Sequence, residues 1–177
     1  MQKKSLCADD LLKETIEQYS PFVYRLAYSL VKSRSDADDI HQEVFITYIK
    51  KRPDFENEEH KKAWFIRVTV NLCKNWQKSA WRRKMVSLTE FGDDWEEGSG
   101  NNMIEVICEE RISEEAASLI NTVKKLPQKY RSVIHLFYYE EMSVEEISRA
   151  MQQKPSTVRT QLTRARRKLS KMLKEEI

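Results

Sequence analysis

The sequence predicts an all-α protein of two small helical domains joined by a flexible acidic linker, the second domain carrying a helix-turn-helix. The 177 residues include only three glycines and four prolines among many helix-forming residues, a composition typical of helical proteins. Apolar residues recur at intervals of three and four along most of the chain, which is the spacing of one helix face. All three glycines fall within residues 92–100, which favours a flexible connection there. The expected parts are a first domain over residues 1–85, a linker over 86–111 and a second domain over 112–177.

Charge is distributed very unevenly, although the net charge is only +3. Residues 61–84 hold eight basic and no acidic side chains, and residues 151–174 again hold eight basic and no acidic ones. Between these tracts, residues 90–115 carry ten acids against the single Arg111. This distribution predicts two contact surfaces for a polyanion, separated by a connector that stays away from it.

The first domain is expected to begin with two helical regions and a loop. An apolar stripe keeps its phase through residues 12–30, with Pro21 on the opposite side. This predicts either one kinked helix or two abutting helices with Ser20 as the cap of the second. A further helix is expected to start at Ser35, because acidic residues follow that suit its positive end. The composition of residues 52–59 predicts a loop.

The helix that starts at Ser35 has an inner and an outer side. Its inner stripe is predicted to consist of Ala37, Ile40, Val44 and Tyr48. Its outer side carries Asp39, Glu43, Ile46 and Lys50. An isoleucine among charges fits a surface that docks on another protein, although single exposed apolar residues are also common in proteins.

A long amphipathic helix is predicted over residues 61–84. At about 100° per residue, its inner stripe consists of Phe65, Val68, Leu72 and Trp76. The opposite side carries Arg67, Asn71, Lys74, Lys78 and Trp81, with Trp64 at its edge. A solvated charged face is one interpretation, but such faces usually mix both signs of charge, and this face does not. Aromatic side chains among cations favour stacking on unpaired bases.

The second domain is predicted to end in a helix-turn-helix. Pro127 opens one helix, and Ser143 caps the next one, with Glu146 at the position that completes a capping box. Residues 152–154 form the turn, and a longer basic helix starts at Pro155 or Ser156. In a helix-turn-helix the second helix lies in the major groove of DNA, although a basic helix in an ordinary bundle is the alternative.

The outer side of the last helix supplies the candidates for reading base pairs. Opposite its apolar stripe lie Ser156, Thr160, Thr163, Arg164 and Arg167. Arginine can bind guanine through two hydrogen bonds, and threonine offers a hydroxyl and a methyl group. Three cations flank this face and are expected on phosphates, which position a protein without specifying sequence: Arg159, Lys168 and Lys171.

The residue pattern does not indicate an enzyme. His41, His60 and His135 lack the spacing of zinc ligands, and the chain has no glycine loop that would bind phosphate. The acidic residues at the start of the second helix are more typical of partners for the helix dipole than of metal ligands. We therefore expect no catalytic activity, no metal and no cofactor.

Cysteine usage and hydropathy bear on the compartment. The three cysteines are an odd number and lie far apart, which indicates a reducing environment rather than a disulfide framework. No apolar run reaches the length that spans a membrane, and the N-terminus lacks the apolar core of a signal peptide. We expect a soluble cytoplasmic protein without direct membrane insertion.

Four segments resemble a known family. They are DADDIHQEVFITYIKK (36–51), AWFIRVTVNLCKNW (63–76), LPQKYRSVIHLFYYEEMSVEEISRAM (126–151) and STVRTQLTRARRKL (156–169). In this order they resemble the sigma factors of bacterial RNA polymerase, and the small two-domain size resembles the extracytoplasmic-function (ECF) group. The resemblance implies a region 2-like first domain and a region 4-like second domain. It also implies a protein that binds core RNA polymerase, directs it to promoters and helps to melt the −10 region.

The resemblance also implies roles for three groups of residues. The second helix resembles the contact with the polymerase clamp helices, which would involve Asp39, Gln42, Glu43 and Ile46. The basic helix and the loop before it resemble the reader of the melted −10 element, with Asn71 near a flipped base, and would involve Trp64, Arg67, Asn71, Lys74 and Lys78. The last helix resembles the reader of the duplex −35 element and would involve Ser156, Thr157, Arg159, Thr160, Thr163, Arg164 and Arg167. Thr160, Gln161 and Thr163 differ from the residues frequent there in the family, so the preferred −35 sequence is not carried over.

The implied partners are core RNA polymerase, promoter DNA and an anti-sigma factor, either free or membrane-bound. The alternative is an autonomous helix-turn-helix regulator whose N-terminal half is a sensor or dimerisation domain. A regulator of that kind needs no surface for single-stranded DNA, so residues 52–84 distinguish the two hypotheses.

Overall fold

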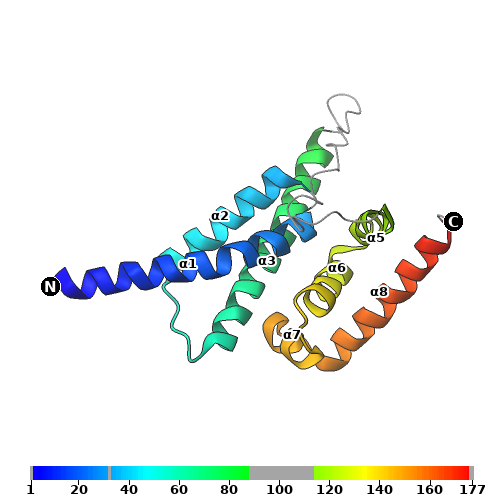
Figure 1. The fold of residues 1–177 in the computed structure, drawn as a ribbon. Helices are drawn as coiled ribbons and strands as arrows, with labels where there is room; N and C mark the ends of the chain where they lie inside the picture. The colour runs from blue at the N-terminus through cyan, green and yellow to red at the C-terminus, as the bar shows by residue number, and fades with distance from the viewer. Residues whose placement is uncertain (1, 32, 88–113, 176–177) are drawn as a thin grey trace.

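The computed structural model describes residues 2–31, 33–87 and 114–175, and every element of this part of the chain is a helix (Figure 1). The N-terminal domain consists of α1 (Gln2–Val31), α2 (Arg34–Lys51) and α3 (Glu58–Ser87). The C-terminal domain consists of α5 (Glu114–Lys124), α6 (Gln128–Ile134), the π-helix η1 (His135–Tyr139), α7 (Val144–Met151) and α8 (Pro155–Glu175). The predicted all-α class with two helical domains is confirmed. Residues 88–111 of the predicted linker lie outside the described residues.

The ends of α1 and α2 refine the predicted boundaries. Helix α1 is continuous with Pro21 inside it, so the alternative of two abutting helices is wrong. Pro21 is exposed, and the backbone carbonyl that a proline leaves unpaired is therefore tolerated more easily. Helix α2 is capped by Ser33 rather than Ser35, since the Ser33 hydroxyl accepts a 3.4 Å hydrogen bond from the Asp36 amide.

The N-terminal core forms where α1, α2 and α3 meet. Helix α1 contributes Val23, Leu26 and Leu30, which are completely buried. The stripe predicted for α2 lies inward as expected, and the ring of Tyr19 stacks on the ring of Phe65 with 4.5 Å between centroids. Burying an aromatic or aliphatic side chain of this kind contributes about 1.5–3 kcal/mol, so packing against α1 and α2 fixes which side of α3 faces outward.

The inner side of α3 is rotated from the predicted one. Phe65 is buried as predicted, whereas Val68, Leu72 and Trp76 are only partly buried and pack against the edge of the core. The other buried residues of α3 are Ile66, Thr69, Val70 and Cys73. The polar Thr69 can be buried because its hydroxyl donates a 2.8 Å hydrogen bond to the Phe65 carbonyl, which satisfies it locally. Periodicity read from large apolar residues therefore missed a face made partly of threonine and cysteine.

The C-terminal domain contains the predicted helix-turn-helix. The capping box at the start of α7 is complete, since Ser143 accepts from the Glu146 amide and the Glu146 carboxylate accepts from the Ser143 amide. Gln152 ends α7 in the left-handed conformation, at φ 52°. Helix α8 buries Val158, Leu162 and Ala165 against this domain, so its opposite side faces outward.

The two domains contact each other directly. Helix α3 packs against α7, and α1 packs against α6 (Figure 1). None of the described helices combines the length and the apolar character that crossing a bilayer requires.

Candidate nucleic-acid and protein interfaces

The outer face of α2 brings together the residues predicted to dock on polymerase. Asp39, Gln42, Glu43 and Ile46 are all exposed, and Ile46 has an exposed fraction of 39%. They follow one another at intervals of three and four, so they share one side of the helix. Ile49, three residues beyond Ile46, is 41% exposed and extends this surface. Its spacing could have identified it, but a single exposed isoleucine carried too little weight.

Three of the residues predicted on the outer side of α3 are accessible to a ligand, whereas Arg67 contacts the C-terminal domain. Asn71, Lys74 and Lys78 are exposed. Within the described part of the chain, neither lysine has an ion-pair partner. Cations that are not neutralised by neighbouring acids are available to phosphates. Trp81 was also predicted on this side, but the structure does not describe its side chain.

Trp64 lies in an aromatic cluster beside this face and is only half-exposed. Its ring centroid is 5.8 Å from that of Tyr48, 6.0 Å from that of Phe55 and 5.1 Å from that of Phe65. Phe55 belongs to the loop before α3, so the cluster attaches this loop to the helix. The predicted Trp64 therefore has a structural role, and it offers only part of its ring to a base.

Arg67 is held by the other domain. Its Nε donates a hydrogen bond of 3.4 Å to the carbonyl of Ala150, near the C-terminal end of α7. Carbonyl groups at a helix C-terminus carry partial negative charge, which suits a cation. Of the predicted −10 residues, Arg67 is thus the one whose charged group touches α7.

The outer face of α8 presents every residue predicted for the −35 element. All seven are exposed: Ser156, Thr157, Arg159, Thr160, Thr163, Arg164 and Arg167. The hydroxyls of Thr160 and Thr163 donate to the carbonyls of Ser156 and Arg159 at 2.8 and 2.9 Å. With their hydrogens directed at the backbone, both threonines present methyl groups and oxygen lone pairs to a ligand.

Two adjoining hollows lie along this face of α8. One, of about 270 Å³, lies between α6 and the start of α8 and is lined by Lys129, Tyr130, Ser156, Thr157, Thr160, Gln161 and Arg164. The other, of about 520 Å³, runs along the second half of α8 and is lined by Tyr130, Arg164, Arg167, Lys168, Ser170, Lys171 and Lys174. Lys129 and Tyr130 come from α6 and were not predicted, because contacts between helices are invisible to the periodicity of one helix.

Arg159 is paired within its own domain. Its Nη2 donates a 2.7 Å hydrogen bond to Oε1 of Glu145 in the first turn of α7, and both side chains are more than half exposed. An exposed pair of this kind contributes only about 0.2–1 kcal/mol. Arg159 can therefore exchange Glu145 for a phosphate at small cost.

Two family models match the chain, one to each domain. The model "Sigma-70 region 2" matches residues 15–83, and the model "Sigma-70, region 4" matches residues 116–169. The first covers the outer faces of α2 and α3 that carry the predicted residues, and the second covers that of α8.

Individual relatives agree with these models. The ECF RNA polymerase sigma-E factor of Escherichia coli K12 is 30% identical over 134 residues, which cover 74% of this chain and 70% of that protein. The ECF RNA polymerase sigma factor SigE of Mycolicibacterium smegmatis is 30% identical over 156 residues, and the match spans 88% of this chain but 59% of that protein. Among solved structures, the sigma factor RpoE of Bartonella quintana, in complex with the anti-sigma factor NepR, has a TM-score of 0.71 and 19% identity. This match covers 92% of this chain and 96% of that chain.

Proposed function

Because this chain belongs to the ECF group of the sigma-70 family of bacterial RNA polymerase sigma factors, we propose that it is a promoter-specificity subunit. It binds core RNA polymerase, directs the enzyme to a set of promoters and helps to melt the −10 region. It catalyses no reaction itself, because it acts by binding polymerase and two promoter elements.

The outer face of α2 is the proposed polymerase contact. Asp39, Gln42, Glu43 and Ile46 are exposed on one side of a helix whose other side is buried. Acidic and amide groups around an isoleucine match the usual composition of a docking surface, in which a small apolar centre has a polar rim. Because this face of α2 is acidic, the polymerase surface that it contacts should be basic.

The outer side of α3 is the proposed −10 surface. Lys74 and Lys78 contact the backbone of the non-template strand, and Asn71 lies in the same row and contacts an unstacked base through its amide. Arg67 joins them when it is released from α7, and the exposed edge of Trp64 supports the strand beside the loop. Cations with an amide and an aromatic edge suit single-stranded DNA, where base faces and edges are accessible.

The outer face of α8 is the proposed −35 surface. Arg164 and Arg167 offer two-pronged hydrogen bonding to guanine, and Thr160 and Thr163 offer methyl groups to thymine. Ser156 and Thr157 lie at the N-terminal end of the helix, where backbone amides favour phosphate. Arg159 contacts the DNA backbone after leaving Glu145.

One observation carries the proposal: the same chain presents a basic face on α3 in addition to a helix-turn-helix. An autonomous regulator would need only the helix-turn-helix to bind its operator. The region 2 model over residues 15–83 supports the sigma factor over this alternative. Such a protein acts in the cytoplasm, where polymerase and promoter DNA are found. An anti-sigma factor is a further proposed partner, since the fold resembles that of a sigma factor solved with one.

The proposal is tested by separating binding to polymerase from binding to DNA. The purified chain is mixed with core RNA polymerase and passed over a size-exclusion column, and it is expected to elute with the polymerase. Glu43→Lys is expected to prevent co-elution, whereas Glu17→Lys, on the exposed side of α1, is the matched control. A chain that binds duplex DNA specifically but never associates with polymerase would be a regulator, and the proposal would then be wrong.

A further inference from the structure

The reading face of α8 combines two threonines with two arginines. Thr160 and Thr163 are three residues apart, and both are exposed. Arg164 and Arg167 each follow one of them by four residues and are exposed as well, so the four side chains share one side of the helix. The arginines suit guanine, but they do not explain how the remaining base pairs of the −35 element are chosen. That part of the preference falls to the threonines.

The hydroxyl hydrogens of both threonines are already used within the helix. Oγ1 of Thr160 donates to the carbonyl of Ser156 at 2.8 Å, and Oγ1 of Thr163 donates to the carbonyl of Arg159 at 2.9 Å. A hydroxyl has a single hydrogen to donate, so neither threonine can donate to a base without losing its bond to the backbone. What each one offers to a base edge is a methyl group and the lone pairs of its oxygen.

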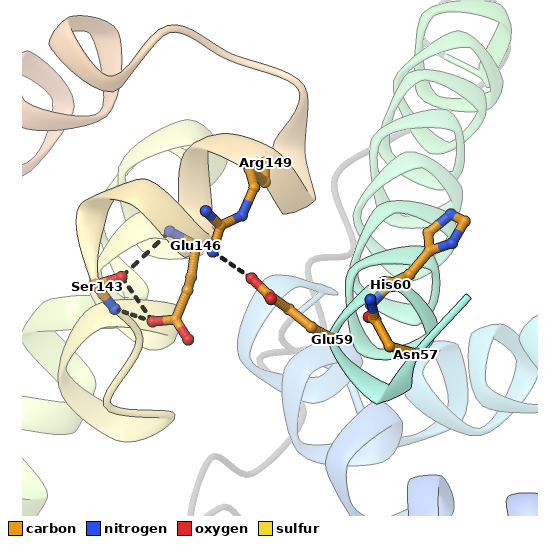
Figure 2. A network of polar contacts seen from close by, with 6 residues as sticks. All are labelled: Asn57, Glu59, His60, Ser143, Glu146 and Arg149. Carbon is orange, nitrogen blue, oxygen red and sulfur yellow. Dashed lines mark hydrogen bonds and ion pairs between the residues drawn. The ribbon is translucent and has the colours of Figure 1, made fainter. Parts of the chain in front are cut away.

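The positions of these methyl groups are fixed by the helix and by its support. Threonine has two heavy atoms on Cβ and few accessible rotamers in a helix, and the bond to the carbonyl four residues earlier favours one of them. Helix α7, against which α8 packs, begins at the capping box of Ser143 and Glu146, which Figure 2 shows. Val158, Leu162 and Ala165 bury the inner side of α8. Groups held on a rigid element in this way can recognise a partner group at a defined place.

Thymine carries the base group that suits a fixed methyl group. In the major groove thymine presents a methyl group at C5 and an acceptor at O4, whereas cytosine presents an amino donor and guanine presents two acceptors. The O4 acceptor cannot bond to a threonine oxygen whose hydrogen is engaged elsewhere. The favourable contact between either threonine and thymine is therefore the apolar contact of two methyl groups.

We propose that Thr160 and Thr163 select pyrimidines that carry a methyl group at C5, so that thymine is preferred at two positions of the −35 element through its methyl group alone. The inference rests on the proposed DNA-reading role of α8. Cytosine lacks this methyl group, but 5-methylcytosine has it, together with an amino group that can donate to a threonine oxygen. The recognised methyl group thus has two sources in DNA, and methylation of a cytosine at either position would create a binding site for this chain.

The test uses the full chain and a duplex that the chain itself selects. A library with about 12 randomised base pairs, slightly more than one helical turn, is enriched for binding, and the enriched duplex is then synthesised with one base changed at a time. Uracil in place of thymine removes only the C5 methyl group. At two positions this change should weaken binding about fourfold in fluorescence anisotropy, the effect of removing one methyl-sized apolar group from a contact. At the same positions 5-methylcytosine should bind at least about fourfold more tightly than cytosine.

Protein variants assign the two positions to the two threonines. Thr160→Ser and Thr163→Ser each remove the methyl group and keep the hydroxyl, so each should abolish the preference for thymine over uracil at one position and leave the other position unchanged. Thr160→Val keeps a methyl group and loses the hydroxyl, and it should retain the preference. The matched control is Thr47→Ser on α2, which should retain both preferences. Each preference is a ratio of two affinities measured with one protein, so a loss of stability in a variant does not change it.

The outcomes separate this inference from the proposed function. Equal binding of the thymine and uracil duplexes would overturn the inference, and so would 5-methylcytosine that binds no better than cytosine. Serine variants that keep the preference, with a valine variant that loses it, would show that the hydroxyl is the reading group and would overturn it too. In all three cases α8 would still bind DNA specifically. A library from which no sequence is enriched would instead refute the DNA-reading role of α8, and this inference with it.

Discussion

Glu145 is expected to weaken DNA binding by holding Arg159. In the free chain the Arg159 guanidinium is hydrogen-bonded to the Glu145 carboxylate at 2.7 Å, and this pair must separate before Arg159 reaches a phosphate. Breaking an exposed pair costs about 0.2–1 kcal/mol. Glu145→Gln removes the charge but keeps the shape of the side chain, so duplex DNA should bind about 1.4 to 5 times more tightly by this term alone.

The salt dependence gives an independent measure of the same change. The change should lie in affinity alone: because Arg159 reaches the same phosphate in both proteins, Glu145→Gln adds no phosphate contact, and the slope of log K against log salt should stay close to that of the unchanged chain. The assay is fluorescence anisotropy of a labelled 30-base-pair duplex at several KCl concentrations. Glu17→Gln is the matched control, since Glu17 is also an exposed acid paired with a cation, Lys13, but lies on α1.

A double-mutant cycle separates pairing from general repulsion. If Glu145 acts by holding Arg159, then Glu145→Gln should have little effect in a chain that already carries Arg159→Gln. The reasoning is refuted if the gain in affinity is the same in both backgrounds, because Glu145 would then act only as a negative charge near DNA.

Three further predictions concern the other surfaces. Glu43→Lys should leave the melting temperature unchanged, because Glu43 is exposed on α2, yet weaken binding to core polymerase by several kcal/mol if the residue is paired there; unchanged affinity in a titration with labelled polymerase would contradict this. Asn71→Ala, in holoenzyme, should still form the closed promoter complex but open it poorly, and a pre-melted template should restore transcription because unpairing is then already complete; no rescue by the template would assign Asn71 another role. Burial alone would raise the pKa of the Glu140 carboxyl, but His135 and Arg25 lower this pKa overall from its usual 4.5. The ionised carboxylate therefore contributes to stability above pH 4.5, and this contribution is lost as the pH falls through the lower pKa of the folded state. Glu140→Gln should therefore lower the melting temperature at neutral pH by about 3 °C, which is the shift that a loss of roughly 1 kcal/mol in the free energy of unfolding causes. In strong acid the same substitution should leave the melting temperature unchanged. A difference in melting temperature that calorimetry finds independent of pH would count against the pairing.

Features that depend on a few neighbouring residues were predictable from the sequence. The capping box of Ser143 and Glu146, the turn after α7 and the outward face of α8 all follow from local propensity and helical period. The outer face of α2 was predicted for the same reason, since its apolar stripe has a single clear phase.

Features that depend on contacts between distant helices were not predictable in this way. The inner side of α3 was only partly predicted, because Thr69 and Cys73 are also buried there, and neither is a strong apolar signal. Arg131 was unremarkable in the sequence, yet its guanidinium binds the carbonyl of Leu30, 101 residues away. Arg67 was predicted on the DNA-binding face, but its bond to Ala150 is also long-range. The π-helix η1 has no signature in the pattern and was not predicted.

The measurement that tests the central claim most directly is run-off transcription with purified core RNA polymerase on a library of genomic fragments. Core polymerase alone should give little specific product, and addition of this chain should give discrete transcripts whose upstream sequences share two elements about two helical turns apart. Lys74→Ala together with Lys78→Ala should reduce all of these transcripts, whereas Arg164→Ala should change which promoters are chosen. If the chain binds polymerase and DNA separately but adds no transcript to those made by core polymerase alone, it is not a promoter-specificity subunit.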